Sequence, residues 1–80
     1  MEVLEIINNG SKHIKDKKIL SYKLDSEILL SKVLNKTRED MLINLDQRVG
    51  PKIINNFLQL IRRRSLKEPI AHILKEKEFW

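Results

Sequence analysis

The sequence predicts an all-α fold, a small bundle of about five short amphipathic helices that ends at the start of a linker. Apolar residues recur every three or four positions along nearly the whole chain, and no stretch before the last residues alternates as a half-buried strand does. Capping and turn residues interrupt this pattern at short intervals, so each helix is short and needs its neighbours to bury its apolar face.

The length and composition of the chain allow one domain with one small hydrophobic core. It has 80 residues, of which 41% are hydrophobic and none is cysteine, so neither a disulfide nor a thiolate metal site holds it together. The first residues are acidic where a secretory signal is basic, and no apolar run approaches the roughly 20 residues of a membrane span. We therefore expect a soluble, cytoplasmic protein with no membrane partner.

The first helix is expected over residues 2–18, with a possible weak point in its middle. Its buried side is expected to carry Val3, Leu4, Ile7 and Ile14. Residues 8–11 read Asn-Asn-Gly-Ser, and glycine inside a helix costs about 1 kcal/mol relative to alanine. We therefore expect a break or a kink near Gly10.

The second and third helices are expected on either side of Asn35, which is a natural helix stop. Either Asp25 or Ser26 can cap the start of the second helix. Thr37 is expected to cap the third, in a capping box with Asp40 in place of the usual glutamate. The apolar residues of these two helices are Ile28, Leu29, Leu30, Val33, Leu34, Met41, Leu42 and Leu45.

Two further helices are expected in the second half of the chain. Gly50 and Pro51 mark the start of the fourth, since proline suits a first helical turn. Residues 62–64 are all arginine and are expected to end it, where the helix dipole favours cations. The fifth is expected to begin at Glu68 and Pro69. The apolar residues of the two helices are Ile53, Ile54, Phe57, Leu58, Ile61, Ile70, Ile73 and Leu74.

The chain lacks the groups that catalysis or cofactor binding needs. It has only two glycines, so it contains no glycine-rich phosphate loop. His13 and His72 are far apart, and no cysteine or carboxylate completes a metal site with them. We expect His13 on a solvated helix face and His72 partly buried and hydrogen-bonded to backbone. No catalytic, cofactor-binding or metal-binding residue is therefore predicted.

Two stretches resemble a known protein family. Residues 24–30, LDSEILL, are close to the LDAEILL opening of an early helix in that family. Residues 62–64 (RRR), 68–73 (EPIAHI) and 78–80 (EFW) together are similar to the RR-x-x-x-EPIAYI-x-G-x-x-EF-[WY] segment of the HemK/PrmC release factor glutamine methyltransferases. The resemblance covers essentially the whole chain and is strongest in its last part.

The resemblance implies a role in translation termination. Full-length members transfer a methyl group from S-adenosylmethionine to the glutamine of the GGQ motif in class I peptide chain release factors. A Rossmann-like C-terminal domain with an NPPY motif holds the donor and the glutamine, and this chain has no NPPY motif. Residues 1–75 then correspond to a substrate-recognition domain, and residues 76–80 begin the linker to the catalytic domain. The implied partners are the release factor and that catalytic domain, with the protein a monomer.

The resemblance also suggests which residues make contacts. A basic cluster beside the domain exit, Arg62, Arg63, Arg64 and Lys67, is the candidate surface for the release factor. Alternatively, these arginines cap the fourth helix, or Arg63 or Arg64 holds the next turn through a hydrogen bond to Glu68. The candidates for contact with the linker or the catalytic domain are Glu68, Pro69, His72, Phe79 and Trp80.

Two questions stay open at this point. Lys75 stands where the family usually has glycine, so either the last helix continues through Glu76 or the chain leaves it by another path. The net charge of +5 also admits a small basic RNA-binding module, and a generic protein-interaction bundle is a third possibility. Abundant lysine, isoleucine and asparagine fit an A/T-rich coding sequence equally well, so nucleic acid is not the expected partner.

Overall fold

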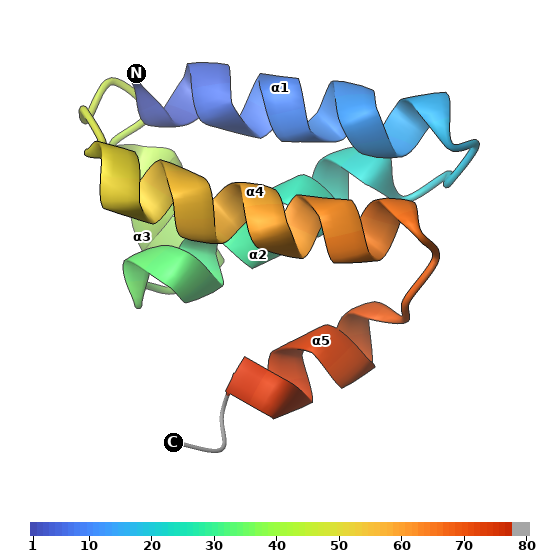
Figure 1. Ribbon diagram of the computed structural model, residues 1–80. Helices are drawn as coiled ribbons and strands as arrows, with labels where there is room; N and C mark the ends of the chain where they lie inside the picture. The colour runs from blue at the N-terminus through green and yellow to red at the C-terminus, as the bar shows by residue number, and fades with distance from the viewer. Residues whose placement is uncertain (78–80) are drawn as a thin grey trace.

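The computed structural model describes residues 1–77 and confirms the predicted small helical bundle, with five helices and no strand in that range (Figure 1). The helices are α1 (Val3–Asp16), α2 (Tyr22–Leu34), α3 (Arg38–Ile43), α4 (Pro51–Ser65) and α5 (Ile70–Lys77). Helices α1, α2 and α4 pack against one another in pairs, α3 packs on α2, and α5 packs on α4 and α2. The bundle is therefore a three-helix centre with two short helices added to it.

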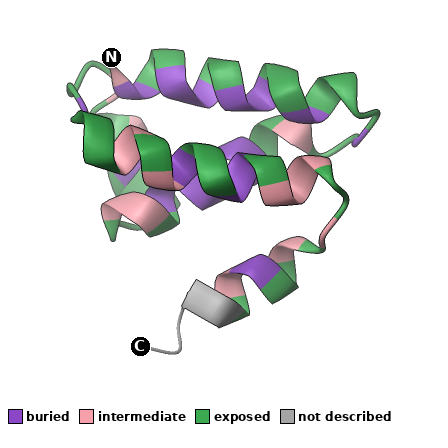
Figure 2. Cartoon of the chain, viewed as in Figure 1, coloured by how far each residue is buried: buried purple, intermediate pink, exposed green. Residues whose placement is uncertain are grey.

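The hydrophobic core lies between the facing sides of α1, α2 and α4. Figure 2 shows that the buried residues of α1 lie on its inner side, while the outer side is exposed. Phe57 is fully buried at the centre, and Ile73 brings α5 to the same cluster. The core consists of Val3, Ile6, Ile7, Ile14, Ile19, Leu29, Leu30, Met41, Val49, Phe57, Leu60, Ile61 and Ile73.

Helix α1 is continuous through Gly10, so the expected break or kink there is wrong. Gly10 is buried where α1 crosses α2 and α4. A Cβ atom at this position would lie only 2.6 Å from Cζ of Phe57 and 2.6 Å from Oγ of Ser26. The hydroxyl of Ser26 donates a hydrogen bond of 2.8 Å to the carbonyl oxygen of Ile7, across the same contact. The glycine thus allows three helices to approach closely, and this outweighs its low helix propensity.

Helix α2 begins earlier than expected, at Tyr22 with Ser21 before it. Asp25 and Ser26 are buried inside the helix and do not cap it, so that prediction is wrong. Both side chains are used in contacts with other helices, which local sequence patterns do not reveal. The predicted stop is confirmed, because Asn35 ends the helix with a left-handed backbone at φ 58°.

Two leucines predicted for the core lie largely at the surface. Leu4 is 46% exposed and Leu58 is 43% exposed, whereas Ile6 and Leu60 are buried. Adjacent positions on a helix point about 100° apart, so a residue next to a buried one can lie outside the buried stripe. The buried stripe of each helix is therefore narrower than the apolar pattern suggests. Leu58 therefore lies at the edge of the contact between α1 and α4.

The predicted N-cap residue of α3 and the predicted start of α4 are confirmed. The hydroxyl oxygen of Thr37 accepts a hydrogen bond of 3.1 Å from the backbone N–H of Asp40 at the start of α3. Gly50 precedes α4, and Pro51 is its first residue. On α3, Met41 is buried and Leu42 is partly buried, as expected.

The connection between α3 and α4 holds the first turn of α1. The backbone N–H groups of Val3 and Leu4 donate to the carbonyl oxygens of Gln47 and Leu45, at 3.0 and 3.1 Å. The N–H of Val49 donates in turn to the carbonyl oxygen of Met1 at 2.9 Å. The first N–H groups of a helix lack acceptors within the helix. The carbonyl oxygens of this connection supply acceptors for the first turn of α1.

Helix α5 begins after Pro69 and continues past Lys75 to Lys77, which selects the first of the two paths considered for the chain. Two residues expected to start the linker, Glu76 and Lys77, are therefore helical. Ile73 is fully buried and Ile70 and Leu74 are partly buried, so the shared apolar face is confirmed. Phe79 and Trp80 lie outside the described residues.

Replacing Gly10 with alanine should destabilise the protein, although alanine is the better helix former. The new methyl group would overlap the buried ring of Phe57 and the bonded hydroxyl of Ser26, so we expect a loss of about 1–3 kcal/mol in the free energy of unfolding. Urea unfolding followed by far-ultraviolet circular dichroism measures this.

The matched control is Asn8→Ala, at an exposed position of the same helix. It should stabilise the protein by about 0.5 kcal/mol through helix propensity alone. A similar gain for Gly10→Ala would contradict the close helix contact.

Candidate interaction site at the basic end of the bundle

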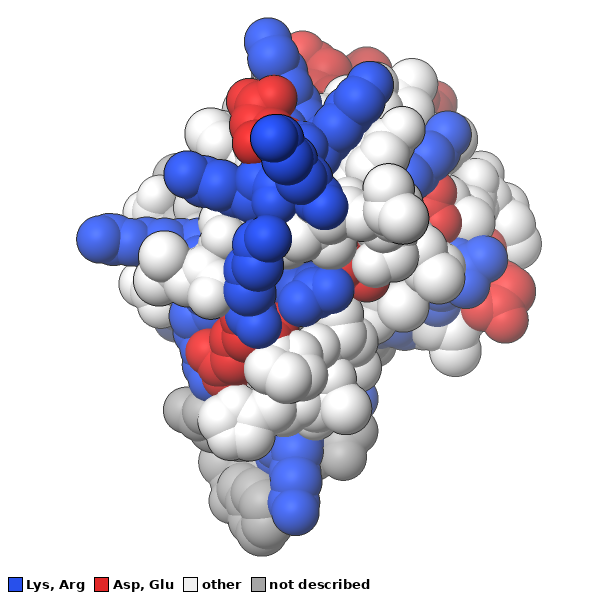
Figure 3. Space-filling view, turned by 90° about the vertical axis from the view of Figure 1, so that its right-hand side faces the viewer, with Lys and Arg blue, Asp and Glu red and all other residues white. Residues whose placement is uncertain are grey.

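Helices α1 and α4 run in the same direction, so their C-terminal ends lie at one end of the bundle (Figure 1). Figure 3 looks at that end and shows lysine and arginine side chains gathered over it. We call this region the basic end, and its exposed cations are Lys15, Lys17, Lys18, Arg62 and Lys67. Cations are stabilised beside the C-terminal ends of helices, which accounts for part of the clustering.

Arg63 is bound to the turn that follows α4. Its Nε donates to Oε1 of Glu68 at 2.9 Å, and its terminal nitrogen pairs with Oε2 of the same carboxylate. Nδ1 of His72 lies 2.6 Å from Oε2 of Glu68. The hydrogen bond from Arg63 above all, with that from His72, lowers the pKa of Glu68 from 4.5 to about 2. The carboxylate of Glu68 therefore binds one side chain from α4, that of Arg63, and one from α5, that of His72.

Arg64 joins three parts of the bundle. Its Nε donates to Oδ2 of Asp25 on α2 at 2.8 Å, and its NH1 donates to the backbone carbonyl of Glu68 at 2.9 Å. The hydroxyl of Ser21 donates to the same oxygen of Asp25 at 2.9 Å. The side chains of Arg64 and Asp25 are only 17% and 6% exposed, so this ion pair is largely shielded from water.

The four residues of the predicted contact cluster thus have different surroundings. Arg63 and Arg64 make the hydrogen bonds to Glu68 that the alternative interpretation required. Arg62 and Lys67 are exposed, and Lys67 has a left-handed backbone at φ 70° just after α4. Sequence analysis missed Asp25 as the partner of Arg64, because the two residues are 39 positions apart and no local spacing connects them.

The residues proposed to contact a linker or a second domain lie around the turn between α4 and α5. The carbonyl oxygen of Pro69 accepts hydrogen bonds of 3.1 Å from the backbone N–H groups of His72 and Ile73, which starts α5. The prediction for His72 is wrong in two respects, because its side chain is 65% exposed and its partner is the carboxylate of Glu68. His13 is exposed on α1, as predicted.

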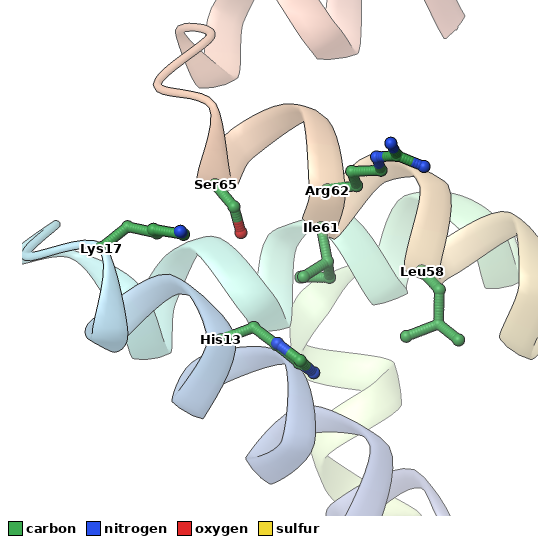
Figure 4. Close-up of a pocket in the computed structure, with 6 residues that line it drawn as sticks. All are labelled: His13, Lys17, Leu58, Ile61, Arg62 and Ser65. Carbon is green, nitrogen blue, oxygen red and sulfur yellow. The ribbon is translucent and has the colours of Figure 1, made fainter.

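A hollow of about 260 Å³ lies between the ends of α1 and α4 (Figure 4). Leu58 and Ile61 extend from α4 toward α1, and Lys17 and Ser65 extend toward each other from the two helix ends. The hollow is lined by His13, Lys17, Leu58, Ile61, Arg62 and Ser65. Sequence reasoning did not find it, because its two sides are more than forty residues apart in the chain and become neighbours only through helix packing.

A second, smaller hollow of about 80 Å³ lies beside Leu58 between the same two helices. Its lining is almost entirely apolar. The residues around it are Met1, Ile6, Asn9, Ile54, Phe57 and Leu58. Leu58 therefore belongs to both hollows, which form one interrupted groove between α1 and α4.

The described residues do not fit a nucleotide-like methyl donor such as S-adenosylmethionine. Such cofactors are bound by backbone N–H groups of glycine-rich loops, but Gly10 is packed in the core and Gly50 precedes α4. Within residues 1–77 no three potential ligands among histidines and carboxylates gather as a metal site would require. No helix in this range is long and apolar enough to cross a membrane.

The fold defines the chain as a small all-helical domain, and comparison with known proteins identifies its family. Residues 5–74 match the family model of the PrmC N-terminal domain. The chain belongs to this family, which confirms the resemblance noted in the sequence. No solved structure shows a significant match to the chain.

Several relatives match the chain over most of its length. The bifunctional methyltransferase of Rickettsia felis is 37% identical over 78 residues, which are 98% of this chain and 15% of the relative. The release factor glutamine methyltransferase of Buchnera aphidicola from Acyrthosiphon pisum is 47% identical over 58 residues, 72% of this chain and 21% of the relative. That of Leptospira interrogans is 31% identical over 78 residues, 98% of this chain and 27% of the relative. The chain thus spans about a quarter or less of these relatives.

Replacing Asp25 with asparagine should destabilise the bundle. The change leaves the guanidinium of Arg64 without its carboxylate in a largely buried position. Hydrogen bonds to charged groups contribute about 1.5–3 kcal/mol, so we expect a loss of that size in the free energy of unfolding, measured by urea denaturation. The matched control is Asp46→Asn in the exposed loop before α4, which should change stability little. Equal effects of the two changes would contradict the role of the buried ion pair.

The contribution of Glu68 to stability should disappear in acid. Its pKa is about 2 in the folded protein, below the ordinary 4.5, so the charged form is bound more favourably in the folded state. This stabilisation is complete above the ordinary pKa and is lost as the pH falls toward 2. The urea midpoints of the wild type and of Glu68→Gln should therefore differ at pH 5 and converge near pH 2. Midpoints that differ by the same amount at both pH values would contradict the assignment.

Proposed function

We propose that this chain is the N-terminal, substrate-recognition domain of a methyltransferase that modifies the glutamine of the GGQ motif in class I peptide chain release factors. The observation that carries the proposal is the family match over residues 5–74, joined to relatives named release factor glutamine methyltransferases. Residues 1–75 would form the domain, and the residues after them would lead to a catalytic domain. In this proposal the full-length protein is a cytoplasmic monomer.

A helical domain of this kind can assist the reaction by positioning the substrate. A catalytic pocket contacts one glutamine, whereas a release factor is a large protein whose orientation decides whether that glutamine reaches the pocket. A separate docking surface supplies contact area, steers the charged partner and reduces the entropy lost at the reacting groups. Among the four candidates for this contact, Arg62 and Lys67 present their cations to solvent.

Arg63 and Arg64 would act on recognition indirectly. They fix the turn between α4 and α5 through Glu68 and Asp25, and α5 is the element through which the chain leaves the bundle. The angle between α4 and α5 would then set the direction toward the catalytic domain. Glu68 and Pro69 lie in this turn and His72 lies in the first turn of α5, and we propose that Phe79 and Trp80 contact the catalytic domain.

S-adenosylmethionine, in this proposal, binds in the catalytic domain and supplies the methyl group there. The domain described here would hold no cofactor, in keeping with the poor fit of Gly10 and Gly50 to a phosphate-binding loop. Its contribution would be to bind and orient the protein substrate.

The exposed cations of the basic end also favour a second candidate, a small RNA-binding module. Lysines and arginines release counterions from phosphates, so such binding would weaken steeply as salt rises. No aromatic side chain lines the hollow at the basic end, however, and stacking on aromatic rings is a main source of affinity for single-stranded RNA. The described residues therefore favour a protein partner.

Removing residues 1–80 from the full-length enzyme tests the proposed function. With intact release factor as substrate, the truncated enzyme should lose about 100-fold in kcat/KM, because the target glutamine is no longer positioned. With a short peptide that contains the GGQ motif, both enzymes should be equally active, since the peptide has no surface for this domain. Unchanged methylation of intact release factor by the truncated enzyme would contradict the proposal.

A further inference from the structure

The groove between α1 and α4 combines unpaired cations with an apolar floor. Lys17 and Arg62 lie at its wider end, and no side-chain hydrogen bond or ion pair joins either of them to another residue in the described range. Arg63 and Arg64, on the same helix, are bound to carboxylates. Arg62 alone among the three arginines therefore has a guanidinium available for an external partner.

The apolar part of the groove continues from the wider hollow toward the start of α1. Leu58 is 43% exposed and lines both the wider hollow and the smaller one, whose lining includes Ile6 and Ile54. Exposed apolar surface bordered by charges is typical of sites that bind proteins. A segment lying along the groove would place charged groups at one end and an apolar side chain near Leu58.

The chemistry of the cations indicates what this segment carries. A guanidinium forms paired hydrogen bonds with a carboxylate, and Lys17 adds positive charge on the other side of the same hollow. A phosphate would also suit the cations, but it would leave the apolar floor around Leu58 and Ile61 uncovered. An acidic side chain followed by an aliphatic or aromatic one satisfies both parts of the groove.

The last described helix does not cover the groove. Helix α5 lies on the opposite side of α4 from α1 (Figure 1). Within residues 1–77, the groove is therefore not filled by α5.

We propose that the groove between α1 and α4 is the surface that binds the release factor, and that it receives an acidic segment of that protein. Arg62 and Lys17 bind carboxylates of the segment, and Leu58 contacts a neighbouring apolar side chain. This assignment rests on the proposed function and adds to it the face of the domain and the chemistry of the segment recognised.

The test compares two double variants of the full-length enzyme that each lose two positive charges. Lys17→Gln/Arg62→Gln removes cations from the groove, and Lys23→Gln/Lys52→Gln removes exposed cations elsewhere. The Kd for purified release factor, measured by isothermal titration calorimetry, should rise about tenfold or more for the first variant. It should change less than about twofold for the second, because rim charges outside a contact act only through weak long-range attraction.

A second pair of variants tests the apolar part independently of charge. Leu58→Ala should also raise the Kd severalfold, whereas Ile43→Ala, at an exposed position on α3, should leave it unchanged. The unfolding midpoints of all variants, measured by circular dichroism, show that the domain remains folded. The leucine variant keeps the proposal testable even if the loss of two cations alters stability.

The outcomes separate this inference from the proposed function. If release factor binds and the groove variants weaken it no more than their controls, the groove assignment is overturned and the recognition role stands. If removing residues 1–80 has no effect on methylation of release factor, the proposed function itself fails. If Lys17→Gln/Arg62→Gln abolishes binding of single-stranded poly(U) RNA but leaves release factor binding intact, the groove is an RNA site and the protein partner is overturned.

Discussion

The close contact of α1 with α2 and α4 at Gly10 determines how the rest of the bundle is arranged. A helix carrying any side chain at this position could not come so near to the ring of Phe57 and the hydroxyl of Ser26. The buried residues of α1 lie on the side that faces this contact, and Leu4 remains at the surface. The same packing brings the C-terminal ends of α1 and α4 together, which creates the basic end and the groove beside it.

The three consecutive arginines show how neighbouring residues of one type acquire different roles. On a helix, adjacent positions point about 100° apart, so Arg62, Arg63 and Arg64 face different surroundings. Arg64 reaches α2, Arg63 reaches the turn before α5, and Arg62 lies at the edge of the groove with its guanidinium extending away from α1 (Figure 4). A run of cations that reads as one binding patch in the sequence therefore includes two arginines bound within the bundle and one that is exposed to solvent.

Sequence reasoning predicted the features that depend on neighbours in the chain. Thr37, Asn35 and Gly50-Pro51 mark real helix ends, because capping and turn formation need only a few adjacent residues. The predictions for Gly10 and Asp25 were wrong, because their roles depend on contacts with Phe57 and Arg64, which are distant in the sequence. Local propensity alone indicated a helix kink at Gly10 and a helix cap at Asp25. Likewise, the division of the candidate cluster into bound and exposed arginines, and the groove with Lys17 and Leu58, could be seen only once the helices were packed.

The groove between α1 and α4 is, in our proposal, the surface through which this helical domain recognises its protein partner. Hydrogen–deuterium exchange of the full-length enzyme, with and without release factor, tests it most directly. The account predicts that release factor slows exchange in peptides covering residues 9–18 and 53–66, while peptides from α3 are unaffected. Protection confined to α3, or confined to regions outside residues 1–80, would contradict it.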